Sequence, residues 1–191
     1  MRFFYQEKNI IRRLFLIIGR HKAGFIICLF LVSAIPTAFA QQETNYAVKA
    51  NIIYHFTKYI DWPSDKKSGD FIIGVIGNTA LYNELKKNIA NKMVVNQKIV
   101  IKKFSALAAG LNCQVLFIGD DESDNIKKIV SATTGSATLL ISESDGLAKR
   151  GSCINFVIVA DHLKLEINKD NIEERGLSIA SELLQLGKII K

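Results

Sequence analysis

Four short runs of almost uninterrupted apolar residues alternate with segments of helical periodicity, and this alternation limits the folds open to the chain. The runs cover residues 71–76, 114–118, 137–141 and 154–159. A continuous apolar run is typical of a strand covered on both faces, as in parallel sheets. We therefore predict a three-layer α/β sandwich with a mostly parallel sheet.

The segments between these runs predict the remaining elements. Apolar residues at helical spacing indicate a first helix that begins near Tyr46 and stops at Trp62-Pro63, because proline cannot continue a helix. Residues 98–104 alternate as in a strand near a sheet edge, and residues 105–110 indicate a small helical turn. A turn at 160–162 predicts an antiparallel hairpin at one end of the sheet. Further helices are expected over 80–91, after 119–124, and from about 171 to 189.

The first forty residues have the layout of a secretory signal peptide. Six basic residues and one acid precede an uncharged apolar run over 23–35, and the small-x-small site Ala38-Phe39-Ala40 follows. We expect cleavage after Ala40, export to the periplasm and a single domain over residues 41–191. An uncleaved membrane anchor is the alternative, although a run of 13 residues is shorter than the roughly 20 that span a bilayer.

The basic charge of the chain belongs largely to this leader. Of 25 basic and 18 acidic residues, the leader holds six and one, so residues 41–191 carry a net charge of only +2. A nucleic-acid partner predicted from net charge therefore has no support.

The sequence contains no recognisable catalytic motif. We find no nucleophile elbow, phosphate-binding loop or histidine pair at zinc-binding spacing, and we expect no enzyme activity, no cofactor and no metal site. A small-molecule binding module is the competing hypothesis, since α/β sheets offer a crevice at the carboxyl ends of their strands. The residues expected to line that crevice are Gly77, Asn78, Gly119, Asp120, Ser142 and Glu143. A hydrolase that uses Asp120 or Glu143 is a third alternative.

Five blocks in order resemble the YfiR family of small secreted bacterial proteins. The first is Lys49-Ala-x-x-x-Tyr-x-Phe-x-Lys-Tyr-Ile-x-Trp-Pro63, and the others cover residues 113–118, 139–146, 151–156, and 165–168 with 176–186. Together they span nearly all of the chain after residue 45.

The resemblance implies regulation rather than catalysis. Proteins of this family act in the periplasm as inhibitors of a membrane-bound diguanylate cyclase, and so lower cyclic di-GMP signalling and biofilm formation. They engage the periplasmic sensor domain of the cyclase, are sequestered by an outer-membrane lipoprotein, and tend to form homodimers. We expect the same partners here.

The last block supplies candidate partner-binding residues, which are Glu166, Asn168 and Ile172. Glu166 lies in a predicted strand on the face opposite Leu165 and Ile167, and Ile172 is an apolar residue within a polar run. The alternative is that Ile172 packs at the amino-terminal end of the last helix.

Two cysteines, Cys113 and Cys153, remain in the exported part. In an oxidising compartment they could form one disulfide if their strand ends lie close together, and two buried free thiols are the alternative. Many relatives in the resembled family carry a cysteine in the first strand facing the Cys113 position. Gly74 stands there in this chain, which casts doubt on a redox role carried over from the family.

Overall fold

The structure is a computed structural model that describes residues 36–105 and 110–191, with side chains from residue 45 onward. The chain divides into two units, Met1–Thr44 and Asn45–Lys191, and the architecture below is that of the second. In chain order its elements are α2 (Pro36–Phe56), β1 (Ile60–Asp61), η1 (Ser64–Lys66), β2 (Phe71–Ile76), α3 (Thr79–Asn88), β3 (Met93–Val94), β4 (Gln97–Phe104), β5 (Val115–Ile118), η2 (Asp120–Asn125), α4 (Ile126–Ala132), β6 (Leu139–Ser142), η3 (Leu147–Arg150), β7 (Ile154–Val159), β8 (His162–Asn168), α5 (Lys169–Glu173), β9 (Ser178–Ile179), α6 (Ser181–Leu184) and β10 (Lys188–Ile190).

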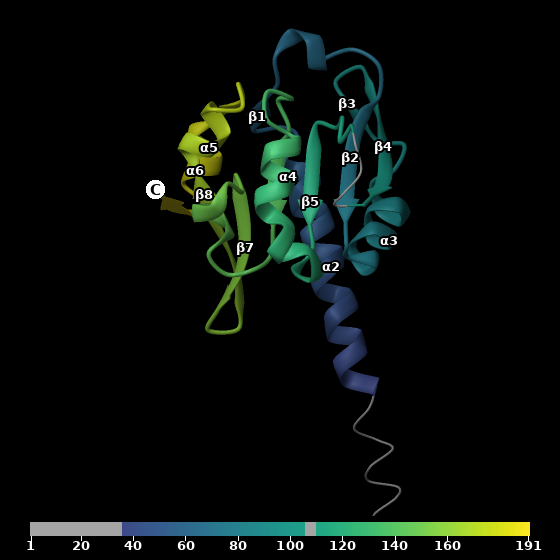
Figure 1. The fold of residues 1–191 in the computed structure, drawn as a ribbon. Helices are drawn as coiled ribbons and strands as arrows, with labels where there is room; N and C mark the ends of the chain where they lie inside the picture. The colour runs from purple at the N-terminus through teal and green to yellow at the C-terminus, as the bar shows by residue number, and fades with distance from the viewer. Residues whose placement is uncertain (1–35, 106–109) are drawn as a thin grey trace, which may run out of the picture. The chain divides into compact units, whose positions relative to one another are not determined.

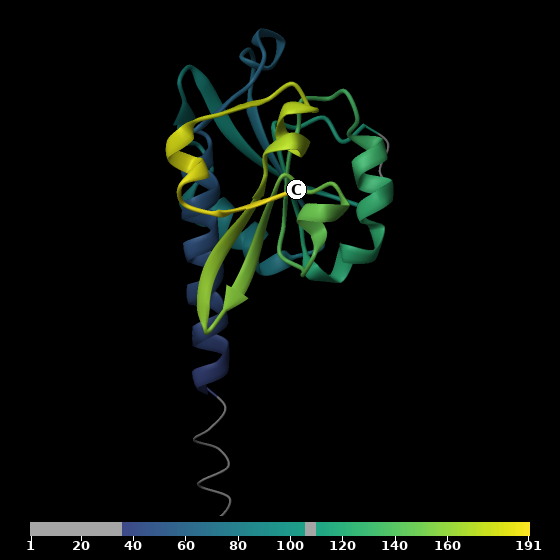
Figure 2. The same ribbon diagram turned by 90° about the vertical axis from the view of Figure 1, so that its left-hand side faces the viewer.

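The main sheet has the strand order β10-β8-β7-β6-β5-β2-β4-β3. The five strands β4, β2, β5, β6 and β7 are parallel to one another, whereas β3 is antiparallel to β4, and β7 and β8 form an antiparallel hairpin. Helices α2 and α3 lie on one face of this sheet and α4 on the other, as Figures 1 and 2 show. The predicted α/β sandwich with a mostly parallel sheet and a C-terminal hairpin is confirmed.

The apolar runs form the centre of the core, as their composition predicts. Every residue of β5 and β6 is buried, and so are all but one of β2. The ring of Phe156 on β7 lies 6.2 Å from that of Phe56 on α2 and 6.4 Å from that of Phe117 on β5. Helix α2 is therefore held to the sheet by aromatic contacts across the layer boundary.

The first helix ends earlier than predicted. It stops at Phe56, and a tight turn follows in which the Thr57 hydroxyl donates to the carbonyl oxygen of Tyr54 at 2.7 Å. The next residues form β1, which pairs with β9 in a separate two-stranded sheet. Trp62 is nevertheless buried as expected, and its indole Nε1 donates to the Gln114 carbonyl at 3.1 Å.

The prediction of one long final helix over 171–189 is wrong. The chain forms α5, β9, α6 and β10 there. Gly176 adopts a left-handed φ of +72°, which ends the helical path, and the Ala180 amide donates to the Tyr59 carbonyl at 2.8 Å. Strand pairing with β1 and β8 thus overrides the apolar periodicity.

Of two expectations about the sheet edges, one is corrected and one is confirmed. The β7–β8 hairpin is not the end of the sheet, because β10 adds outside β8 in parallel. Strand β4 lies near the opposite edge, as its alternating pattern predicts, and the two-residue β3 lies outside it. Most of the predicted turn at 105–110 lies outside the described residues.

Candidate functional site

The residues predicted to line a crevice come together at the carboxyl ends of β2, β5 and β6. Asn78 follows β2, and its Nδ2 donates to Glu143 Oε1 at 2.8 Å. The Asp120 amide approaches the same oxygen at 3.4 Å, and the Ser144 hydroxyl donates to the Asp120 carboxylate. Ser142 is the exception, because its hydroxyl is buried in the sheet, where it meets the oxygens of Ser152 and Asn155 at 2.8 and 2.7 Å.

This crevice is filled by groups of the chain itself. The Lys49 ammonium of α2 lies 2.6 Å from Glu143 Oε2, and the two side chains are only 9% and 5% exposed. A side chain at Gly77 would meet the Asp121 carboxylate, and one at Gly119 would lie 2.8 Å from the Asn78 amide nitrogen. The crevice therefore serves as an anchor for α2.

The sequence analysis missed the partnership of Lys49 with Glu143. A signal was present, because Lys49 falls on the same side of the helix as Ile53 and Phe56, and a charge placed toward a core needs a partner. Tyr46 lies beside the ion pair, with its ring centroid 4.8 Å from the Lys49 ammonium. Burial first, and then the charge of Glu143, raises the pKa of the Tyr46 phenol.

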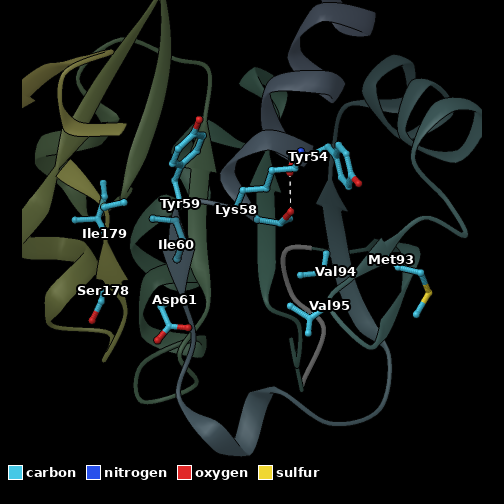
Figure 3. Close-up of a pocket in the computed structure, with 12 residues that line it drawn as sticks. Tyr54, Lys58, Tyr59, Ile60, Asp61, Met93, Val94, Val95, Ser178 and Ile179 are labelled. Atoms are coloured by element: carbon cyan, nitrogen blue, oxygen red, sulfur yellow. Dashed lines mark hydrogen bonds between the residues drawn. The ribbon is translucent and has the colours of Figure 1, made fainter. Parts of the chain in front are cut away.

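The candidate site is a cavity at the other end of α2. Its volume is about 570 Å³, within the usual range of small-molecule sites. In Figure 3 the side chains of β1 and β9 stand on one side and those of the β3 hairpin on the other. The lining residues are Tyr54, Thr57, Lys58, Tyr59, Ile60, Asp61, Met93, Val94, Val95, Ser178, Ile179 and Ala180.

The cavity combines aromatic, apolar and charged groups. The ammonium groups of Lys58 and Lys92 lie 5.7 and 4.7 Å from the Tyr54 ring centroid, and the Asp61 carboxylate accepts from Lys67 at 2.7 Å. Such a surface can bind a small, partly apolar molecule or a peptide side chain. Sequence reasoning missed the cavity because its walls come from three distant segments, 54–61, 93–95 and 178–180.

Comparison with known proteins identifies the family of the chain. The model of the YfiR/HmsC-like family, DUF4154, matches residues 46–188. The chain belongs to this family. The cavity segments 54–61 and 178–180 fall within the blocks that carry the resemblance.

The other comparisons concern remote similarities. No curated protein matches the chain. A Streptococcus pneumoniae ABC domain solved in complex with L-Trp is 13% identical over 62% of this chain, with a TM-score of 0.45. A conserved domain protein from Vibrio cholerae is 16% identical over 63% of the chain, with a TM-score of 0.48. The alignments cover 55% of the length of each solved structure.

The three candidate partner-binding residues do not form an exposed surface in this family member. Ile172 is completely buried, and Asn168 is 6% exposed because its Oδ1 caps α5 by accepting from the Asn171 amide at 3.0 Å. Glu166 is half-buried and accepts from Asn155 Nδ2 at 3.3 Å. The expectation of a surface is corrected, and the burial of Ile172 fits the packing alternative.

The two cysteines are free and buried. They precede β5 and β7, which are separated by β6, so two strand spacings, roughly 10 Å, lie between them. A disulfide needs α-carbons within about 7 Å. Burial raises the pKa of Cys113 to about 12 and that of Cys153 to about 11, so both thiols stay protonated at neutral pH.

The position of Gly74 has no room for a side chain. It pairs with Leu116 in the register of β2 and β5. A β-carbon at Gly74 would lie 2.7 Å from the Phe104 ring and 2.9 Å from Leu116, so the neighbouring side chains occupy the space.

The described part of the chain holds no group of three or more histidine, cysteine, aspartate or glutamate side chains arranged to bind a metal ion. Within the same residues, no helix has the length and hydropathy needed to cross a bilayer.

Proposed function

We propose that this protein is an exported regulator that binds the periplasmic sensor domain of a membrane diguanylate cyclase and inhibits the enzyme. The observation that carries the proposal is membership of the YfiR/HmsC-like family across residues 46–188. Inhibition requires that the protein binds one state of the cyclase more tightly than the other, and its extent is bounded by that difference in affinity. An outer-membrane lipoprotein would relieve inhibition by sequestering the protein, and a homodimer is the proposed binding unit.

The arrangement of the charged groups supports a binding role rather than catalysis. Glu143 and Asp120, the residues that a hydrolase would need, already accept hydrogen bonds from Lys49, Asn78 and Ser144. A general base must be free to accept a proton from substrate. These carboxylates instead hold α2 and the loops after β2 and β5 in place.

A direct binding measurement tests the proposal. The exported protein is titrated with the purified periplasmic domain of a diguanylate cyclase encoded by a neighbouring gene. We expect saturable binding by calorimetry. A well-folded protein that shows no binding at high micromolar concentration contradicts the proposal.

The cavity of about 570 Å³ favours a second candidate function, that of a small-molecule binding module. A thermal-shift screen against small polar and aromatic metabolites tests it, with Lys58→Ala and Tyr54→Ala as variants of the lining. A ligand that stabilises the wild-type protein but neither variant supports the module. Such a ligand together with no affinity for the cyclase domain would replace the regulator proposal.

A further inference from the structure

A second cavity, the α2–β8 groove, lies on a different side of α2 from the cavity of Figure 3. Its volume is about 410 Å³. Nine residues line it, from α2 and the turn after it, from β8, and from α6 and the residues that follow. They include Ile52, His55, Leu163, Lys164 and Leu186. Most of these side chains are apolar, although the groove is open to solvent.

Apolar exposure continues along both walls of the groove. On α2, Val48 precedes Ile52 by one turn on the same helix face, and it is 45% exposed. On the hairpin, Ile158 pairs with Leu163 in register and shares a sheet face with it, and Ile158 is 57% exposed. Figures 1 and 2 show that this hairpin projects beyond the neighbouring strands.

Leu186 completes the apolar character of the groove. Its side chain is 65% exposed, although the amphipathic pattern of residues 179–186 would place it in the core of a continuous helix. The chain instead leaves helix α6 after Leu184 and bends at Gly187, where a β-carbon would lie 2.8 Å from the Ile167 side chain. An exposed apolar surface of this kind, bordered by polar residues, is typical of an interaction site.

Lys164 is the charged side chain of the lining, and none of the nine lining residues is acidic. The cavity of Figure 3 differs, since it contains both Lys58 and Asp61. A lysine beside an apolar floor complements an occupant that carries a carboxylate beside its apolar side chains.

From these observations we propose that the α2–β8 groove is the docking site for an apolar, carboxylate-bearing segment of the cyclase's periplasmic domain. The inference rests on the proposed function and gives it a location. The wall formed by α2 is about 10 Å long from Val48 to His55, which is the length of two helical turns. In this arrangement the segment inserts its apolar residues between Ile52 and Leu163 and places a carboxylate against Lys164.

The test compares substitutions on the groove with one at a distant exposed position. Leu186→Glu and Lys164→Glu alter the groove, and Lys127→Glu is the control, because Lys127 is exposed and lies on α4, on the other face of the sheet. Each exported variant is titrated with the same cyclase domain, and its melting temperature is measured. We expect both groove variants to bind at least about tenfold more weakly and the control to change by less than about twofold, all with near wild-type melting temperatures.

The outcomes separate this inference from the proposed function. If the wild-type protein does not bind the domain, the proposed function fails. If the wild-type protein binds and both groove variants bind as tightly as it does, the groove is not the docking site, and the proposed function stands. If Leu186→Glu changes the sedimentation of the free protein while cyclase affinity is unchanged, a second copy of the chain occupies the groove and the inference is overturned.

Discussion

At the scale of single residues, the Lys49–Glu143 ion pair is the feature that joins the first helix to the sheet. Both charges are removed from water, and Glu143 also accepts from Asn78. A buried pair of this kind adds little net stability compared with apolar residues, but the loss of one partner leaves the other charge buried and uncompensated. The pair therefore fixes where α2 lies.

Replacing one member of this pair should destabilise the fold strongly. We expect Lys49→Met to lower the free energy of unfolding by about 3–5 kcal/mol in a denaturant titration. The double variant Lys49→Met/Glu143→Gln should recover at least half of that loss. As a control, Lys67→Met removes the exposed pair with Asp61 and should cost less than about 1 kcal/mol. Equal losses in the single and double variants would contradict the assigned role.

The burial of the two thiols predicts how they react with thiol reagents and how the stability of the protein depends on pH. At about pH 8 neither Cys113 nor Cys153 should react with a thiol reagent in the folded protein, and both should react after denaturation. The pKa values of about 12 and 11 lie above the ordinary 9.0, so this contribution to stability is complete below about pH 9. It is lost as the pH rises from about 9 to 12, because the unfolded thiols ionise first.

Unfolding titrations at several pH values measure this decline. The variants Cys113→Ala and Cys153→Ala should each show a shallower loss of stability above about pH 9 than the wild-type protein. A denatured, unreduced sample without reactive thiols would instead reveal a disulfide.

At the scale of secondary structure, local patterns predicted the central strands well and the C-terminal segment poorly. Strand β2 begins and ends where its apolar run does, because a strand buried on both faces has few alternative positions. Strand β7 also has the bounds of its run, although its last two residues are exposed. The segment after Ile172 has helical periodicity, but Gly176 and Gly187 interrupt it, and distant strands pair with its residues. Pairing over more than 100 residues, as between Ile60 and Ile179, leaves no local signal.

The same limit applies to the sites. The crevice residues were predictable because parallel strands end at one edge of a sheet. The cavity of Figure 3 and the α2–β8 groove were not, because each combines α2 with segments more than 100 residues away.

The turn of the β7–β8 hairpin contains two residues in an unfavourable backbone conformation, and replacing them should stabilise the protein. Ala160 and Asp161 form the two-residue connection and have left-handed φ values of 49° and 60°. Asparagine and glycine adopt such angles at lower cost, so Ala160→Asn/Asp161→Gly should raise the free energy of unfolding by about 1 kcal/mol. The urea midpoint should rise with an unchanged slope. Lys164→Gly, inside β8, is the control and should lower the midpoint.

At the scale of the whole molecule, we propose an exported α/β domain that acts through its surface. The intact mass of the secreted protein tests the export step. We expect a chain that begins at Gln41, because the small-x-small site ends at Ala40. A mass that includes the basic leader would favour the uncleaved anchor.

The intracellular concentration of cyclic di-GMP tests the central claim most directly. It should be measured by mass spectrometry in wild-type cells, in a strain lacking this gene, and in that strain complemented with the wild-type or the Leu186→Glu gene. We predict that deletion raises cyclic di-GMP and surface attachment, and that only the wild-type gene restores the low level. An unchanged concentration after deletion would contradict the account.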